Sequence, residues 1–150
     1  MCKCKEQETV EVKIRYVDDE CKIEKIALGD WIDLRSQETI RFHPFKFKLI
    51  DLGFAMELPD GYEAHAVPRS STYKKWRVIQ ANHMGVIDNS YAGNNDIWKF
   101  PALGFGFRKI NKGDRICQFR IVKKQPTINF VEVDNLEKED RGGIGSTGVK

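Results

Sequence analysis

Short apolar runs separated by polar turns dominate the pattern along the chain. Residues 10–16 alternate between apolar and polar side chains, which is the period of a half-buried strand. Residues 42–52 and 53–58 are rich in aromatic and β-forming residues and end at a Pro-Asp-Gly turn at 59–61. Further strand-like runs lie at residues 62–67, 78–79, 84–87, 97–100, 115–123 and 127–133, while residues 23–28 are ambiguous.

One short helix is expected among these strands. Residues 71–76 favour a turn or two of helix, and Ser70 or Ser71 is placed to cap its start. The chain has no long segment of helical period and no internal repeat. The pattern therefore predicts an all-β fold: a sandwich, a barrel or a jelly roll.

The C-terminal residues differ in composition from the rest. We expect residues 1–134 to form one β-barrel domain and residues 135–150 to form an arm. The arm begins with charged residues and ends in a segment with four glycines in seven residues, 142–148. Such a segment cannot build a core, so we expect it to be mobile until a ligand orders it.

Composition excludes several classes of protein. The 150 residues are enough for one domain, and a net charge of +3 is too small to indicate a nucleic-acid surface. No apolar run approaches the ~20 residues of a membrane span, and no secretory signal is visible. The four cysteines lack metal-site spacing, and Cys117 is expected in the core. We expect a soluble, cytoplasmic protein.

The segment 85–93, GVIDNSYAG, carries the first candidate chemistry. It predicts a strand that runs into a tight turn, with Asp88 at the turn and Tyr91 three residues later. The carboxylate is anionic at neutral pH and can accept a proton from water. The ring offers a flat surface for a sugar or a base. An ordinary surface hairpin is the structural alternative.

Three other segments suit an anionic ligand. Arg69, in PRSS at 68–71, offers a two-pronged donor beside two hydroxyl groups. Gln118, in KGDRICQ at 112–118, offers an amide. Arg141 precedes a glycine-rich run whose backbone N–H groups can wrap a phosphate chain. No P-loop signature is present. Taken singly, these segments are more commonly a helix cap, a hairpin and a disordered tail.

Taken in order, five segments resemble the motifs of the trimeric deoxyuridine triphosphate nucleotidohydrolases (dUTPases), across residues 30–149. They are DWIDLR (30–35), PRSS (68–71), GVIDNSYAG (85–93), KGDRICQ (112–118) and RGGIGSTG (141–148). The sequence looks closest to the phage and Gram-positive branch. The resemblance implies a distorted jelly roll or β-barrel, a homotrimer, and a flexible Gly-rich C-terminal arm.

The resemblance also implies roles around the base and the attacking water. Asp88 would be the general base, and Tyr91 would stack under the deoxyribose and exclude a 2′-hydroxyl. Asn82 would face the uracil together with backbone groups of Val86 and Ile87.

A second set of roles concerns the phosphates. The residues implied to hold them are Arg69, Ser70, Ser71 and Gln118, and those implied to close over them in a neighbouring subunit are Arg141, Gly145, Ser146 and Thr147. Mg²⁺ would be held mainly by the triphosphate and water. Asp33 would lie near the metal-bound waters or brace the site.

The chain departs from the family pattern in three places. Ile144 stands where a Phe usually covers the uracil, and the arginine lies closer to the glycines than usual. Trp98 and Phe100 are the alternative rings for a lid, although a place in a core strand is the favoured interpretation. Asn89 and Ser90 stand where an acidic residue is common, without an expected effect on the chemistry.

The implied activity is hydrolysis of dUTP to dUMP and pyrophosphate, which limits uracil in DNA and supplies dUMP for thymidylate synthesis. No nucleic-acid or membrane partner is expected. Three alternatives stay open: a dCTP deaminase on the same fold, a nucleotide-gated regulator that binds a protein partner, and a binding module without catalysis.

Overall fold

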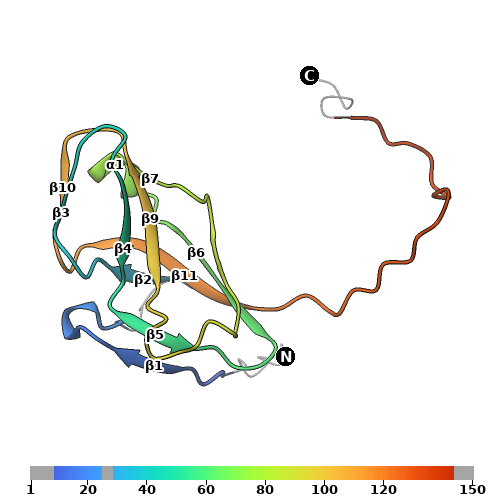
Figure 1. Cartoon of the computed structure of the whole chain (residues 1–150), viewed down its shortest axis with the longest axis horizontal. Helices are drawn as coiled ribbons and strands as arrows, with labels where there is room; N and C mark the ends of the chain where they lie inside the picture. The colour runs from blue at the N-terminus through green and yellow to red at the C-terminus, as the bar shows by residue number, and fades with distance from the viewer. Residues whose placement is uncertain (1–8, 25–28, 144–150) are drawn as a thin grey trace, which may run out of the picture.

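The computed structural model describes residues 9–24 and 29–143, and strands make up nearly all of its regular structure (Figure 1). The two helices are η1 (Asp19–Cys21) and α1 (Thr72–Trp76), and neither could cross a membrane. The all-β expectation is confirmed. The strands are β1 (Lys13–Tyr16), β2 (Ile32–Arg35), β3 (Ile40–Phe42), β4 (Phe47–Asp51), β5 (Phe54–Glu57), β6 (Tyr62–Pro68), β7 (Val78–Gln80), β8 (Gly85–Ile87), β9 (Lys99–Gly104), β10 (Arg108–Ile110) and β11 (Arg115–Lys123).

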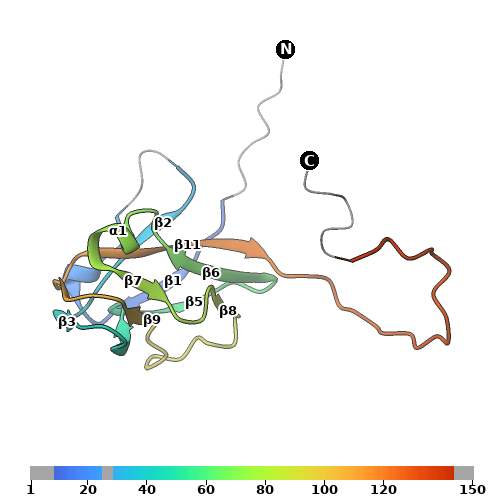
Figure 2. The ribbon, with the colours of Figure 1, turned by 90° about the horizontal axis from the view of Figure 1, so that it is seen from above.

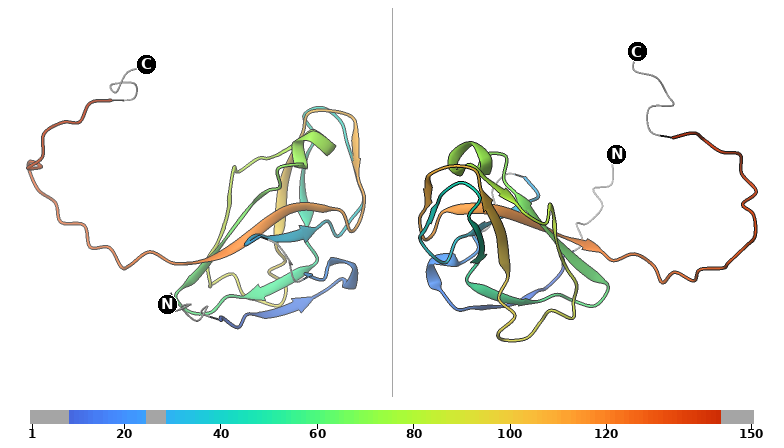
Figure 3. Two further views of the ribbon diagram at one scale, coloured as in Figure 1. Left: turned by 180° about the vertical axis from the view of Figure 1, so that it is seen from behind. Right: turned by 45° about the horizontal axis from the view of Figure 1, so that its top comes forward.

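Antiparallel pairing joins these strands into small sheets that surround one core (Figures 1 and 3). The largest sheet has the order β2-β11-β6-β8, and a second has the order β4-β9-β7. Two further pairs, β1-β5 and β10-β3, complete the barrel. The long strand β11 pairs with both β2 and β6, so it brings three segments that are distant in sequence side by side.

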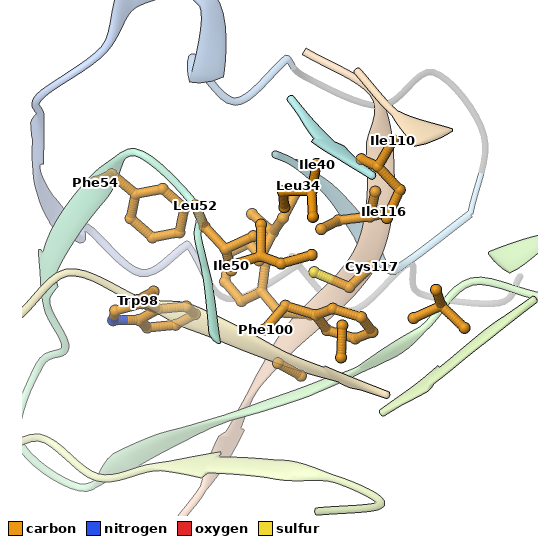
Figure 4. Close-up of a cluster of buried hydrophobic side chains, with 14 of the residues drawn as sticks. Leu34, Ile40, Ile50, Leu52, Phe54, Trp98, Phe100, Ile110, Ile116 and Cys117 are labelled. Carbon is orange, nitrogen blue, oxygen red and sulfur yellow. The ribbon is translucent and has the colours of Figure 1, made fainter. Parts of the chain in front are cut away.

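The interior of the barrel is apolar (Figure 4). Trp98 lies between Phe54 and Phe119, with ring centroids 5.2 and 5.3 Å away. Cys117 is fully buried, as expected, and burial raises the pKa of its thiol. Because the core is closed and apolar, a polar ligand must bind on the outside of the sheets.

Most of the predicted elements are present, with changed limits. The helix expected at 71–76 is α1, and the run 42–52 is broken by a turn in which Phe45 has φ 66°. The strand expected at 97–100 begins later, as β9. The strands β2, β3 and β10 were not predicted, because each has only three or four residues.

The strand predicted at residues 127–133 is wrong for this single chain. After β11 the chain leaves the barrel and runs through residues 124–143 without a strand (Figure 2). Its apolar side chains are exposed, and Phe130 is 90% exposed. The segment has strand-like residues but no neighbouring strand in this chain to pair with, and an unpaired backbone cannot form a ladder.

Candidate active site

Four polar side chains gather around the strands β2, β6 and β11. Asp33 of β2 accepts from Arg69 Nε at 2.9 Å through Oδ1 and from Arg115 Nη1 at 3.2 Å through Oδ2. Arg69 also donates to the carbonyl of Arg115 at 3.1 Å, and Gln118 Nε2 donates to the carbonyl of Pro68 at 3.3 Å. Two guanidinium groups against one carboxylate leave a net positive charge. We call Asp33, Arg69, Arg115 and Gln118 the cationic cluster.

A β-bulge in β11 creates this arrangement. The register between β11 and β2 shifts between Arg115 and Cys117, so Ile116 is an extra residue. Both Ile116 and Cys117 are fully buried, which breaks the ordinary alternation. The bulge therefore leaves Arg115 exposed and places Gln118 opposite Asp33 on β2. Bulges next to functional sites re-aim side chains in this way.

A buried threonine holds the turn that carries Arg69. The Thr72 hydroxyl accepts from the backbone N–H of Arg69 at 3.0 Å and donates to the carbonyl of Ile116 at 2.8 Å. Ser71 occupies the N-cap position of α1, but its side chain makes no capping hydrogen bond. Ser70 is exposed. Thr72 thus pins the turn to β11 and leaves the Ser71 hydroxyl uncommitted to the helix.

The segment with Asp88 lies at the edge of the largest sheet. Strand β8 is the last strand of that sheet and pairs on one side with β6. Its outer backbone edge therefore has no strand partner in the described part of the chain. Val86 is 60% exposed, and Asp88 follows β8 directly. An unpaired edge offers alternating donors and acceptors that can pair with the edge of a base.

The turn after β8 fixes the Asp88 carboxylate. The hydroxyl of Ser90 donates to Asp88 Oδ1, and the backbone N–H of Ser90 donates to the same atom at 2.8 Å. The bond from the Ser90 hydroxyl has the larger effect and the bond from the Ser90 N–H the smaller, and both hold the pKa of the Asp88 carboxyl below its ordinary value. Tyr91 donates its hydroxyl to the carbonyl of Ile97 at 3.1 Å and keeps its side chain 38% exposed.

The turn between β7 and β8 positions Asn82. Its side-chain oxygen accepts from Gln80 Nε2 at 2.9 Å, and its carbonyl accepts from the N–H of Met84 at 2.7 Å. His83 lies in the left-handed region with φ 65°. Asn82 is exposed, while Gln80 is buried. The Asn82 amide is therefore held at the surface close to the start of β8.

One chain does not bring Asp88 and the cationic cluster together. Ile87 is opposite Ala64 in β6, so Asp88 lies near the start of β6, whereas Arg69 follows its end. At about 3.3 Å per residue, the distance from Ala64 to Arg69 is roughly 17 Å along the strand. Strand β8 pairs with the middle of β6, and Figure 2 shows α1 beyond the end of β6. The structure thus places the predicted base and the predicted phosphate ligands in two separate half-sites.

Comparisons with known proteins identify the family of this chain. The family model described as dUTPase matches residues 31–148. The chain belongs to the dUTPase family. It is 58% identical over 142 residues, 94% of this chain and 100% of the other, to the SPbeta prophage-derived deoxyuridine 5′-triphosphate nucleotidohydrolase YosS of Bacillus subtilis (strain 168). It is 38% identical to the enzyme of that name from Escherichia phage T5, over 93% of this chain and 99% of the other.

Solved structures show the same fold. A dUTPase of Staphylococcus bacteriophage 80alpha, bound to dUpNHpp, superposes with a TM-score of 0.78 over 94% of this chain and all of that chain, at 19% identity. A dUTPase of phage phi11 of S. aureus, studied for its structural Mg(II) ion, gives a TM-score of 0.72 over 86% of this chain and all of that chain, also at 19% identity. The resemblance to the phage and Gram-positive branch of the dUTPases is confirmed.

The two rings considered as uracil lids are part of the dUTPase core. Trp98 is 2% exposed and Phe100 is 1% exposed. Their interpretation as lids is wrong, because neither ring reaches the surface of the hairpin, and the core interpretation holds. Trp98 Nε1 has no hydrogen-bond partner within the described residues.

Part of the fifth dUTPase motif can be placed. Arg141 is described and exposed. The segment after β11 extends away from the barrel of its own chain (Figure 3). Ile144, Gly145, Ser146 and Thr147 lie outside the described residues, so their predicted roles stay predictions.

Both carboxylate oxygens of Asp33 are engaged by arginines, which fits its predicted role as a brace for the site. Its alternative place near metal-bound waters stays a prediction. Among residues 9–24 and 29–143, no group of three His, Cys, Asp or Glu side chains is placed to hold a metal ion.

Three contributors to the dUTPase site were missed by sequence reasoning: Arg115, Thr72 and Gln80. Arg115 lies within a quoted motif, and its proximity to Gln118 was the available signal. Thr72 and Gln80 act through the bonds they make to other site residues, and nothing in the sequence alone points to those bonds.

Proposed function

We propose that this protein hydrolyses dUTP to dUMP and pyrophosphate in the cytoplasm. Water attacks the α-phosphorus, and the Asp88 carboxylate accepts the proton of that water. The observation that carries the proposal is the cationic cluster, in which segments from three motifs meet around Asp33. The activity lowers the dUTP available to DNA synthesis and supplies dUMP for thymidylate synthesis.

The phosphates bind at the cationic cluster. The Asp33 carboxylate holds the Arg69 side chain, so its fork is oriented before the ligand arrives. Arg115 adds charge, and the Ser71 hydroxyl and the exposed Ser70 are free to donate to phosphate oxygens. The Gln118 amide, anchored to Pro68, completes the set.

A Mg²⁺ ion bound to the triphosphate and to water would neutralise charge that develops on the phosphate oxygens. The chain contributes cations and neutral donors around it. The phi11 dUTPase, whose structure is titled for a structural Mg(II) ion, supports a magnesium requirement in this family.

The uracil and the sugar bind at the hairpin. The free edge of β8 presents backbone groups of Val86 and Ile87 to the base, and the exposed Asn82 amide extends that edge. The half-exposed Tyr91 ring lies under the deoxyribose, where a 2′-hydroxyl would collide with it. The protein selects the base because a wrong base leaves donors and acceptors of the hairpin unpaired. Each unpaired group costs ~1–3 kcal/mol of binding free energy.

The complete site is formed by more than one copy of the chain. A water held by Asp88 must be adjacent to the α-phosphate, yet the two half-sites lie roughly 17 Å apart along β6. The phosphate half-site of one copy therefore meets the hairpin of another. We propose the homotrimer that the family resemblance implies, since a closed ring repeats this head-to-tail contact and leaves no contact surface unpaired.

The segment after β11 supports an assembly of copies. Its apolar residues Ile128 and Phe130, and Leu136 of the arm, are at least half exposed in one chain, so they need a surface. An apolar groove beside β1 offers such a surface, and a second copy's arm would fill it. The arm would then deliver Arg141, Gly145, Ser146 and Thr147 over a neighbour's triphosphate. The groove is lined by Val10, Val12, Ile14, Tyr16, Ile23, Ile32, Met56, Phe119 and Ile121.

Pyrophosphate release from dUTP, dCTP, dTTP and UTP, with and without Mg²⁺, tests the proposal. Rapid release from dUTP alone, dependent on Mg²⁺, is the expected result. Ammonia from dCTP would indicate the deaminase alternative instead. Titles of phage 80alpha dUTPase structures attribute control of gene transfer to those proteins. Nucleotide binding without pyrophosphate release would indicate that such a regulatory role has replaced catalysis here.

A further inference from the structure

We propose that Gln80 is a positioning residue that sets which face of the Asn82 amide is presented to the nucleotide base, and so helps to select uracil over cytosine. This inference rests on the proposed function. It starts from a buried polar side chain that the mechanism does not use. Gln80 is 6% exposed, at the end of β7, two residues before the exposed Asn82.

Two acceptors determine the orientation of the Gln80 amide. Its Nε2 donates to the carbonyl of Ala66 at 3.1 Å and to Asn82 Oδ1 at 2.9 Å. A backbone carbonyl can only accept, so the NH₂ group of Gln80 must face Ala66. The second hydrogen of that group then meets Asn82 and requires an acceptor there. The Asn82 amide is therefore oriented by Ala66 through Gln80.

This orientation leaves the NH₂ group of Asn82 for the ligand. The Asn82 oxygen is occupied by Gln80, and no other bond to the Asn82 side chain is present in the described part of the chain. Uracil carries a carbonyl oxygen at position 4, which accepts a hydrogen bond. Cytosine carries an amino group there, which donates. An Asn82 amide fixed with its NH₂ outward pairs with uracil and leaves the cytosine amino group unpaired.

The packing around Gln80 indicates that the amide is not there for stability. Its oxygen, Oε1, is buried without a hydrogen-bond partner in the described part of the chain, which costs free energy that an apolar side chain would not incur. Gly85 of β8 lies beside the amide: a Cβ at that position would be in ordinary contact with Gln80 Nε2, at 3.5 Å, and in tighter contact with Ala66 Cβ, at 3.3 Å. A buried glutamine with one unsatisfied atom is best explained by the donors that it supplies.

The test compares kcat and KM for dUTP and dCTP in the full-length protein and in Gln80→Leu. We expect Gln80→Leu to remain folded in thermal unfolding, because removal of the unsatisfied Oε1 offsets the loss of the donor to the Ala66 carbonyl. Its kcat/KM for dUTP should fall about five- to tenfold, mainly through KM, and its preference for dUTP over dCTP should fall by a similar factor. In the Asn82→Ala background the same substitution should have no further effect on the preference, because Gln80 acts through Asn82.

Val78→Ala is the matched control. Val78 is buried on the same strand and faces the same way as Gln80, but it makes no part of the amide chain. This variant should lose stability and keep its preference for dUTP. An unchanged dUTP-to-dCTP ratio in Gln80→Leu, with active unmodified protein, would overturn the role of Gln80 alone. Absence of dUTP hydrolysis in the unmodified protein would overturn the proposed function, and this inference with it.

Discussion

Asp88 has the properties that a base for water activation needs. It is exposed at the end of an edge strand, so both water and a nucleotide can reach it. Its two hydrogen bonds from Ser90 use one carboxylate oxygen, and in the described part of the chain the other oxygen has no bond. The free oxygen can face a water molecule while the bound one fixes the direction of the side chain.

Replacement of this carboxylate separates catalysis from binding. Asp88→Asn should lower kcat by about 10²–10⁴-fold and leave the affinity for dUTP nearly unchanged, because an amide keeps the shape but cannot accept the proton. Pyrophosphate release measures the first effect and calorimetric titration with dUTP the second. Asp60→Asn, which removes a neighbouring turn carboxylate, is the control and should retain activity. Normal turnover in Asp88→Asn would exclude Asp88 as the base.

The pH dependence of the reaction tests the role of Ser90. A hydrogen bond donated to an ionised carboxylate stabilises its charged form, so the hydroxyl of Ser90 lowers the pKa of Asp88. Activity should be retained at neutral pH and lost as the pH falls through this lowered pKa. In Ser90→Ala the pKa rises towards its ordinary value, so the acidic limb of kcat/KM moves to higher pH.

Ser90→Thr retains the hydroxyl and is the matched control. Its acidic limb should stay where it is in the unmodified protein. An acidic limb that does not move in Ser90→Ala would show that another group governs it.

At the scale of elements, the joint between α1 and β11 sets the geometry of the phosphate half-site. Thr72 is fully buried and links the turn of Arg69 to the bulge of β11 through two hydrogen bonds. The bulge itself turns Arg115 and Gln118 towards the same side. Neither Thr72 nor the bulge binds the nucleotide directly, but both determine the orientation of the side chains that bind the phosphates.

Loss of the Thr72 hydroxyl should therefore affect both stability and phosphate binding. Thr72→Val keeps the shape but leaves the carbonyl of Ile116 and the N–H of Arg69 without this partner, which should cost about 1–3 kcal/mol in urea unfolding. KM for dUTP should rise as well. Thr72→Ser keeps the hydroxyl and should restore most of both. An unchanged KM in a destabilised Thr72→Val would limit Thr72 to a purely structural role.

Local patterns predict the elements well where each element is stabilised by its own chain. Residues 10–16 and 115–123 have clear alternation or apolar content and form β1 and β11. Residues 127–133 have an equally strong pattern but find no strand to pair with in one chain, so the prediction fails there. Strand propensity describes a side chain that suits a sheet, and the partner strand must come from elsewhere.

The residues of the site also differ in how well the sequence predicts them. Asp88, Arg69 and Gln118 are visible in the sequence because their chemistry suits a nucleotide. The bulge at Ile116 and the amide chain from Ala66 through Gln80 to Asn82 depend on contacts between strands that are distant in sequence. Periodicity within one strand carries no information on those contacts, so the supporting residues were missed while the ligand candidates were found.

At the scale of the whole molecule, one chain does not bring the two proposed half-sites together. Its half-sites lie at opposite ends of β6, and its arm extends away from its own barrel with apolar side chains exposed (Figure 2). Both features are accounted for if each site draws on several copies of the chain. The arm then supplies a cation and backbone donors that exclude water only when the nucleotide is bound.

Removal of the end of the arm tests whether it serves catalysis and not the stability of the fold. Deletion of residues 141–150 should lower kcat/KM for dUTP on the order of 10²–10³-fold, because a cation and a set of N–H donors to the phosphates are lost. The free energy of unfolding should change by less than about 0.5 kcal/mol, since Arg141 is exposed and forms no hydrogen bond or ion pair with the described residues of its own barrel. Urea unfolding and pyrophosphate release give the two values. Loss of the fold on truncation would show that the end of the arm is structural.

The most direct test of a site shared between copies mixes two inactive variants. Asp88→Asn keeps the cationic cluster, and Arg69→Ala keeps the carboxylate. Each variant alone should be inactive, and co-refolding equal amounts should restore about a quarter of the unmodified activity, the share of random neighbour pairs that reunite an intact Arg69 with an intact Asp88. No recovery in mixed oligomers, confirmed as mixed by mass spectrometry, would place both residues of each site in one chain and contradict the account.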